Sequence, residues 1–184
     1  MRSLTLAAGI ATLALPLSAA SSAIISIGGR LSHGCYEAAL SQDDRDFAIG
    51  ECTRALDEEG LGTSDRAATY VNRGILRMMR SDDADADADF DAALALNQNL
   101  PDAWLNKAFL RIRKGDGRDA LPLLQQGIDR KPDRQALAIF ARGVAYEEMG
   151  EYRSAYADLT RAHQLEPHWS LPSEYLSHYR IVSR

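Results

Sequence analysis

Three stretches of this chain align with one another at spacings of 34 and then 35 residues. Two of the aligned positions hold bulky residues, namely Tyr70, Trp104 and Ile139, and Phe90, Leu124 and Leu159. Three hold small residues, namely Gly74, Ala108 and Gly143; Ala86, Ala120 and Ala155; and Ala93, Gly127 and Ala162. A repeat of this length is typical of stacked helical hairpins. Three matches in register therefore predict an all-helical array.

The pattern also has a physical explanation. Small residues let two helices approach closely, and the bulky residues supply the area that a close-packed core buries. Helix stop signals lie between the two helices of each repeat, at Ser81, Gly115 and Gly150. Boundaries between repeats are marked by Pro101, Pro132 and Pro167.

These residues resemble the tetratricopeptide repeat (TPR), in which each unit of about 34 residues pairs two antiparallel helices. The resemblance implies an all-α fold, a right-handed α-solenoid. Within residues 63–169 we expect three units, at about 67–100, 101–135 and 136–169. An extended segment at 24–34 and a degenerate hairpin at 35–62 precede them, and a helix at 170–184 caps the last apolar face.

The N-terminal residues 1–23 have the pattern of a signal peptide. Arg2 is followed by an apolar run over 4–17, and small residues then offer cleavage after Ala20 or Ala23. A membrane-spanning helix needs about 20 apolar residues, more than this run supplies. We therefore expect an exported protein, in the periplasm, with no stable membrane anchor after cleavage.

Cleavage would remove Arg2 alone among the charged residues, leaving 20 basic and 26 acidic residues and a net charge of −6. Nucleic acids and anionic membranes bind basic surfaces. The acidic balance therefore argues against both as partners.

The chain has two cysteines, Cys35 and Cys52, which match the two helices of the degenerate hairpin. In an oxidising compartment an even number of cysteines favours a disulfide, and only one pairing exists. Such a bridge would stabilise the hairpin by roughly 3 kcal/mol. The alternative is two buried thiols.

An acidic run extends from Ser81 to Asp91, with aspartates at alternating positions. A calcium loop of the EF-hand type needs glycine at its sixth place and glutamate at its twelfth, where this chain has Ala88 and Leu94. We expect instead a helix start with a solvated acidic face, favoured by the helix dipole. Weak divalent-cation binding is the alternative.

Basic residues precede the small residue of each unit, at Arg73, Lys107 and Arg142, and two more stand at Arg77 and Arg111. Long basic side chains can pack their stems against a helix and hold the charge in water. We expect that arrangement here. The alternative is a basic ladder that meets an acidic ligand.

The sequence offers no motif for catalysis. The histidines form no metal-ligand set, and the chain contains neither a nucleophile elbow nor a glycine-rich phosphate loop. We expect no enzyme activity, no cofactor and no bound metal.

The TPR resemblance implies a concave groove lined by the first helix of each unit. It assigns to the groove Val71, Asn72, Ile75, Met78, Leu105, Asn106, Phe109, Ile112, Phe140 and Val144, and to the same face Ala68, Asp102, Leu137, Ala141 and Glu147. The family subset that clamps chaperone carboxylates has basic residues and asparagine at five such places. Here only Asn106 fits, so the groove is predicted to be apolar and not a carboxylate clamp.

These observations predict a non-catalytic module that binds a partner peptide or helix in an apolar groove. The alternative is a constitutive structural or regulatory subunit of an envelope complex, with its groove filled by residues 24–34 of its own chain. The sequence does not identify the partner.

Overall fold

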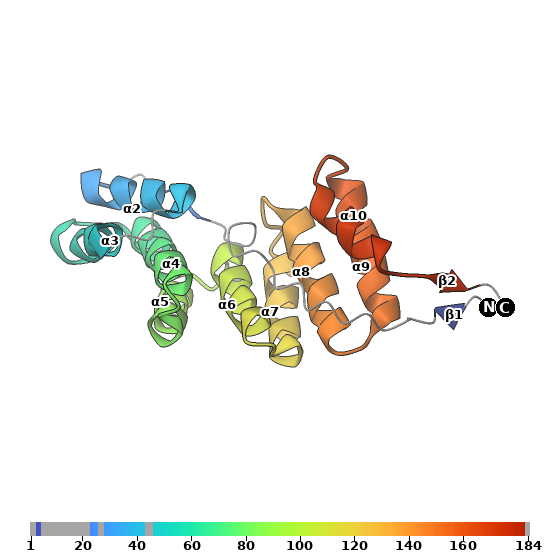
Figure 1. Ribbon diagram of the computed structural model, residues 1–184. Helices are drawn as coiled ribbons and strands as arrows, with labels where there is room; N and C mark the ends of the chain where they lie inside the picture. Colours follow the sequence, from blue (N-terminus) through green and yellow to red (C-terminus); the bar gives the residue numbers. More distant parts are fainter. Residues whose placement is uncertain (1–2, 5–22, 26–27, 43–45, 183–184) are drawn as a thin grey trace.

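The computed structural model describes residues 3–4, 23–25, 28–42 and 46–182 (Figure 1). The described residues fold almost entirely into helices, namely α2 (Arg30–Ser41), α3 (Asp46–Glu58), α4 (Thr63–Met79), α5 (Asp83–Leu96), α6 (Pro101–Arg113), α7 (Gly117–Asp129), α8 (Gln135–Glu148), α9 (Tyr152–Leu165) and α10 (Ser170–Ser177). Two short strands, β1 (Ser3–Leu4) and β2 (Ile181–Val182), pair in antiparallel fashion.

The helices form a row of antiparallel hairpins, α2–α3, α4–α5, α6–α7 and α8–α9, with α10 packed against α9 (Figure 1). Each hairpin packs on its neighbours in the sequence, as in a solenoid. The predicted all-α solenoid is confirmed.

Small residues hold the two helices of each hairpin close together. A methyl group added at Gly74 would lie 2.6 Å from the ring of Phe90, and one at Gly143 would lie 3.1 Å from Leu159. Larger side chains at these places would push the helices apart, because the core is close-packed. The repeated small residues thus set the spacing of the array.

The turn inside each repeat hairpin places one residue in the left-handed region, with φ of 66° at Ser81, 75° at Gly115 and 73° at Gly150. The N–H of each residue donates to a main-chain carbonyl three positions earlier. Glycine adopts this conformation without steric cost, whereas serine does not. The same turn recurs although the first repeat lacks the glycine.

The core consists of two apolar clusters, one around α2–α6 and one around α6–α10. Helix α6 contributes Ala103 and Leu110 to the first cluster, and Leu105 and Phe109 to the second. Because α6 belongs to both, the core continues along the array.

Both ends of the array differ from the expected boundaries. Helix α2 begins at Arg30, so residues 30–34 are helical and not extended. The carboxylate of Glu59 explains this start, because it accepts hydrogen bonds from the N–H groups of Leu31 and Ser32. Most of the expected signal peptide, including the Ala20 cleavage site, lies outside the described residues.

At the other end, the expected capping helix is shorter than 170–184. Helix α10 ends at Ser177, and Ile181 and Val182 form β2 opposite Leu4 and Ser3. In the strand pair, the main-chain groups of Ile181 and Val182 find partners outside the expected helix. Such pairing joins residues far apart in the sequence, so no local pattern predicts it.

Candidate functional site

The N-terminal hairpin is held by the predicted disulfide. Cys35 on α2 and Cys52 on α3 are bonded, with an S–S distance of 2.11 Å, and both are fully buried. The Cys35 sulfur also lies 3.9 Å from the main-chain oxygen of Thr69, so the bridge packs directly on α4. The disulfide prediction is confirmed.

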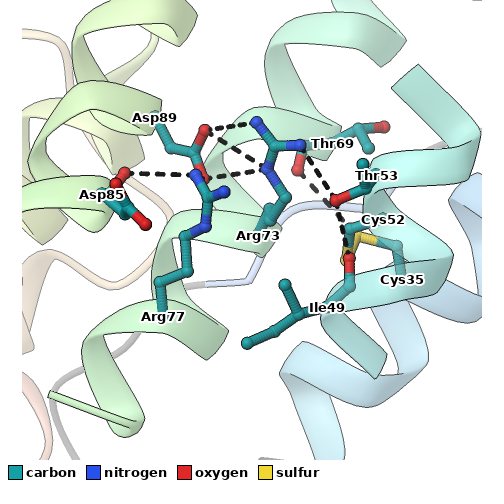
Figure 2. A network of polar contacts seen from close by, with 9 residues as sticks. All are labelled: Cys35, Ile49, Cys52, Thr53, Thr69, Arg73, Arg77, Asp85 and Asp89. Atoms are coloured by element: carbon teal, nitrogen blue, oxygen red, sulfur yellow. Dashed lines mark hydrogen bonds and ion pairs between the residues drawn. A yellow bond between two sulfur atoms is a disulfide. The ribbon is translucent and has the colours of Figure 1, made fainter. Parts of the chain in front are cut away.

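A polar network connects this hairpin to the first repeat (Figure 2). Asp89, only 2% exposed, accepts hydrogen bonds from Arg73 at 2.7 and 3.0 Å and from Arg77 at 2.7 Å. Arg73 also donates to the hydroxyl of Thr53 on α3, at 3.1 Å. Thr53 in turn donates to the main-chain oxygen of Ile49. One arginine therefore bonds to both neighbouring helices.

The third repeat contains an equivalent pair, because Arg142 donates two hydrogen bonds to Asp158 at 2.7 and 2.9 Å. The second repeat differs. Leu123 stands where the other repeats have aspartate, and Lys107 contacts Asp87 and Asp91 on α5 of the preceding repeat. The basic side chain thus turns to the neighbouring unit.

Arg111 adds a further bond between repeats, because it donates to Asp87 at 2.8 Å. Burial disfavours the charged carboxylate of Asp87, but the hydrogen bonds from Arg111 and Lys107 outweigh that effect and lower its pKa. The acidic face of α5 is therefore neutralised by α4 and α6.

Two expectations about charge are corrected by these contacts. The acidic run does not form a purely solvated face, since Asp89 is buried and Asp87 is paired. The basic residues do not simply hold their charges in water, since Arg73 and Arg142 bond to carboxylates of their own repeats. In both pairs the aspartate follows the arginine by sixteen residues. This recurring spacing could have predicted the ion pairs from the sequence.

The ten predicted groove residues lie on α4, α6 and α8, and none is more than 5% exposed in this structure. Phe140 shows one reason: its ring packs edge-on against Trp169 and Tyr175, each at 5.0 Å between ring centroids. The region of α10 thus covers the groove position of the third repeat. Binding of a partner to these residues stays a prediction.

Asn72 is the groove residue with the most informative contact. Its side-chain amide makes two hydrogen bonds to the main chain of Ile24, accepting from the Ile24 N–H at 2.8 Å and donating to the Ile24 oxygen at 2.7 Å. The two residues are 48 positions apart. A side chain of α4 thus holds a segment without helical structure through its main chain. The sequence analysis gave residues 24–34 as an alternative occupant of the groove but did not predict this contact with Asn72.

The second repeat has an asparagine at the equivalent place. Asn106 is also fully buried, and it donates to the main-chain oxygen of Asp102 at 2.8 Å. The third repeat has Ala141 there, which can make no such bonds. Amide side chains at this place are therefore confined to the first two repeats.

The described residues bring together no group of three or more histidine, cysteine, aspartate or glutamate side chains that could hold a metal ion. Within the same residues, no helix is both long and apolar enough to cross a membrane.

Comparison with solved structures identifies the fold. The TPR domain of OM64 from Arabidopsis matches with a TM-score of 0.59 and 20% identity, over 63% of this chain and 95% of that domain. A double mutant of MamA RS-1 matches with a TM-score of 0.64 and 20% identity, over 80% of this chain and 82% of that one. The chain has the TPR fold.

A crystal structure of MamA agrees, with a TM-score of 0.59 and 24% identity over 74% of this chain and 71% of that one. No protein-family model matches the sequence, and a search of curated proteins finds no match either. At such identities the likeness establishes the TPR fold alone. A ligand has to be argued from the residues of this chain.

Proposed function

We propose that this protein is a non-catalytic interaction module whose groove binds an extended peptide segment of a partner protein. The observation that carries the proposal is the pair of hydrogen bonds between Asn72 and the backbone of Ile24. It supports a groove that accepts an extended chain rather than a helix, because a helix keeps its N–H and C=O groups for its own hydrogen bonds.

Apolar contacts would provide the rest of the binding energy. Ala23 and Ile24 are half-buried and pack against the apolar cluster that contains Val71 and Ile75. A peptide that takes this place would present an apolar side chain inward and its backbone to Asn72. The partner is thus an apolar segment without proline at the clamped position, since proline has no N–H to donate.

Crosslinking from Asp102 tests this function. Asp102 is half-buried and holds the repeat position of Ala68 and Leu137, on the predicted inner face. A photoreactive residue at this position in the full chain should crosslink to one defined extended segment of another protein, mapped by mass spectrometry. The yield should fall when Asn72→Ala is added.

Two results would contradict the proposal: crosslinks confined to the chain itself, or a partner whose yield does not change with Asn72→Ala. Circular dichroism of the Asn72→Ala protein provides the control for folding.

We also infer that the protein is exported to the periplasm. The buried Cys35–Cys52 disulfide supports an oxidising compartment. Mass spectrometry of protein purified from cells under thiol-blocking conditions should find oxidised cysteines and a chain that begins at Ser21 or Ile24. A full-length chain with two blocked thiols would argue for the cytoplasm.

A further inference from the structure

We propose that the segment around Ile24 is a built-in competitor for the peptide site; it comprises residues 23–25, or residues 24–25 if cleavage follows Ala23. Ile24 occupies the backbone clamp, by which we mean the two hydrogen bonds that the Asn72 side chain makes to a main chain, and a partner segment binds there only after Ile24 leaves. This inference rests on the proposed function and adds its regulation.

The side-chain amide of Asn72 needs hydrogen-bond partners. Asn72 is 0% exposed while residues 23–25 are in place, so its amide makes its hydrogen bonds within the protein. In this structure Ile24 supplies both the donor and the acceptor that the amide requires. A buried amide left without partners is unfavourable. A competing backbone at this place would keep both hydrogen bonds of the Asn72 amide, whereas departure of the segment without a replacement would lose them.

The side chains of the segment define what can replace it. Ile24 is half-buried against the apolar cluster, whereas the next residue, Ile25, is 61% exposed. A competing ligand therefore needs one branched apolar side chain at the Ile24 place, and the side chain that follows stays in solvent.

The segment also has the advantage of attachment. Five residues separate Ile24 from Arg30, where α2 begins, and Glu59 fixes that helix start through Leu31 and Ser32. A short tether gives the attached segment an effective concentration in the millimolar range. If the segment occupies about nine molecules in ten, the apparent affinity for a free peptide falls about tenfold.

The test uses the full chain and a fluorescein-labelled peptide with the sequence of residues 22–27, followed by fluorescence anisotropy. In Ile24→Asp a carboxylate would have to enter the apolar cluster, so the attached segment should leave. We expect this variant to bind the peptide at least about tenfold more tightly than the unaltered chain. Ile25→Asp is the matched control, since that side chain is exposed, and should behave like the unaltered chain.

Asn72→Ala added to Ile24→Asp should abolish the gain in binding, because the clamp is lost. Ile24→Pro provides a second way to release the segment. It removes the N–H that donates to Asn72 while leaving an apolar side chain in place.

The outcomes separate this inference from the proposed function. Equal binding by the unaltered chain and both Ile24 variants would overturn the competitor and leave the peptide site standing. No binding by any correctly folded variant would overturn the peptide site and, with it, the competitor. Tighter binding by the Ile24 variants alone, dependent on Asn72, is the result that supports both.

Discussion

Asp158 on α9 accepts two hydrogen bonds from Arg142 on α8, sixteen residues earlier in the chain. Arg73 and Asp89 form the same pair between α4 and α5, at positions 69 residues before. In both repeats the ion pair joins the two helices of one hairpin. It therefore contributes to the hairpin itself and not only to the surface charge.

Replacing Asp89 should destabilise the protein strongly. Asp89→Asn leaves the charges of Arg73 and Arg77 largely buried without a counter-ion. Removing one partner of a buried ion pair costs about 3–5 kcal/mol. Because both arginines keep some exposure, we expect a loss of about 3 kcal/mol in the free energy of unfolding, measured with urea.

Asp91→Asn is the control for this measurement. Asp91 also contacts a basic residue, Lys107, but its side chain is 62% exposed. Exposed ion pairs contribute about 0–1 kcal/mol, so the change should stay within that range. Similar losses in the free energy of unfolding for both variants would show that burial does not make the Asp89 ion pairs more stabilising than the exposed pair at Asp91.

Gly74→Ala and Gly143→Ala should differ although they occupy equivalent places. At Gly74 the added methyl group would lie 2.6 Å from the ring of Phe90, which is fully buried. Overpacking of this kind costs about 1–3 kcal/mol. At Gly143 the nearest atom, on Leu159, is 3.1 Å away, and the helix propensity of alanine offsets the tighter contact by up to about 1 kcal/mol.

Thermal unfolding of the two glycine variants would measure this difference. We expect a clear loss of Tm for Gly74→Ala and a small change of either sign for Gly143→Ala. A larger loss at Gly143 would mean that the ring of Phe90 yields more readily than the side chain of Leu159.

Ser81→Gly should stabilise the protein. Ser81 is exposed and has a φ of 66°, in the left-handed region that costs a side-chain-bearing residue about 1–2 kcal/mol. Gly115 and Gly150 avoid this cost at the same turn. Allowing for the greater freedom of glycine in the unfolded chain, we expect a gain of about 0.5–1 kcal/mol in chemical denaturation. Ser81→Ala, which keeps the Cβ atom, should bring no gain.

Glu148 should make stability depend on pH. Although the side chain is exposed as a whole, its carboxyl group lies against Gly117, and burial there raises its pKa to about 7. A hydrogen bond from Gly117 opposes the shift, whereas Asp116 and Glu147 add to it. A pKa raised above the ordinary value of 4.5 means that folding favours the protonated form.

The stabilisation from protonated Glu148 is therefore complete below about pH 4.5 and is lost as the pH rises through about 7. Glu148→Gln stays neutral at every pH. Its Tm should exceed that of the unaltered chain at pH 8 and match it at pH 5. An equal difference at both values would contradict the raised pKa.

The sequence predicted α4–α9 well because the small and bulky positions that build each hairpin recur within the hairpin itself. Gly74 and Phe90, for example, belong to adjacent helices of one repeat. Their separation in the sequence therefore recurs in every repeat, and the recurrence predicts that they are in contact. The disulfide could be predicted for the same reason, since Cys35 and Cys52 matched two adjacent helices.

Contacts between distant parts of the chain were not predictable in this way. No periodic signal connects Asn72 to Ile24, and the bond becomes visible only when the segment and α4 are placed in space. The spacing between Arg73 and Asp89 can be read from the sequence. Whether the two side chains form an ion pair depends on which faces of α4 and α5 meet, and the spacing does not report that. Charge patterns alone suggested a solvated face, because they do not report burial.

The position of Lys107 bears on how such an array can grow by duplication. Arg142 has its acid within its own unit, so a copy of the third repeat would carry both partners with it. A copy of the second repeat inserted after the third would place its lysine opposite Tyr156 and Thr160, the counterparts of Asp87 and Asp91, with Leu123 in its own unit. The basic residue of the second repeat thus depends on one particular neighbour, whereas the ion pair of the third repeat would form wherever that repeat is placed.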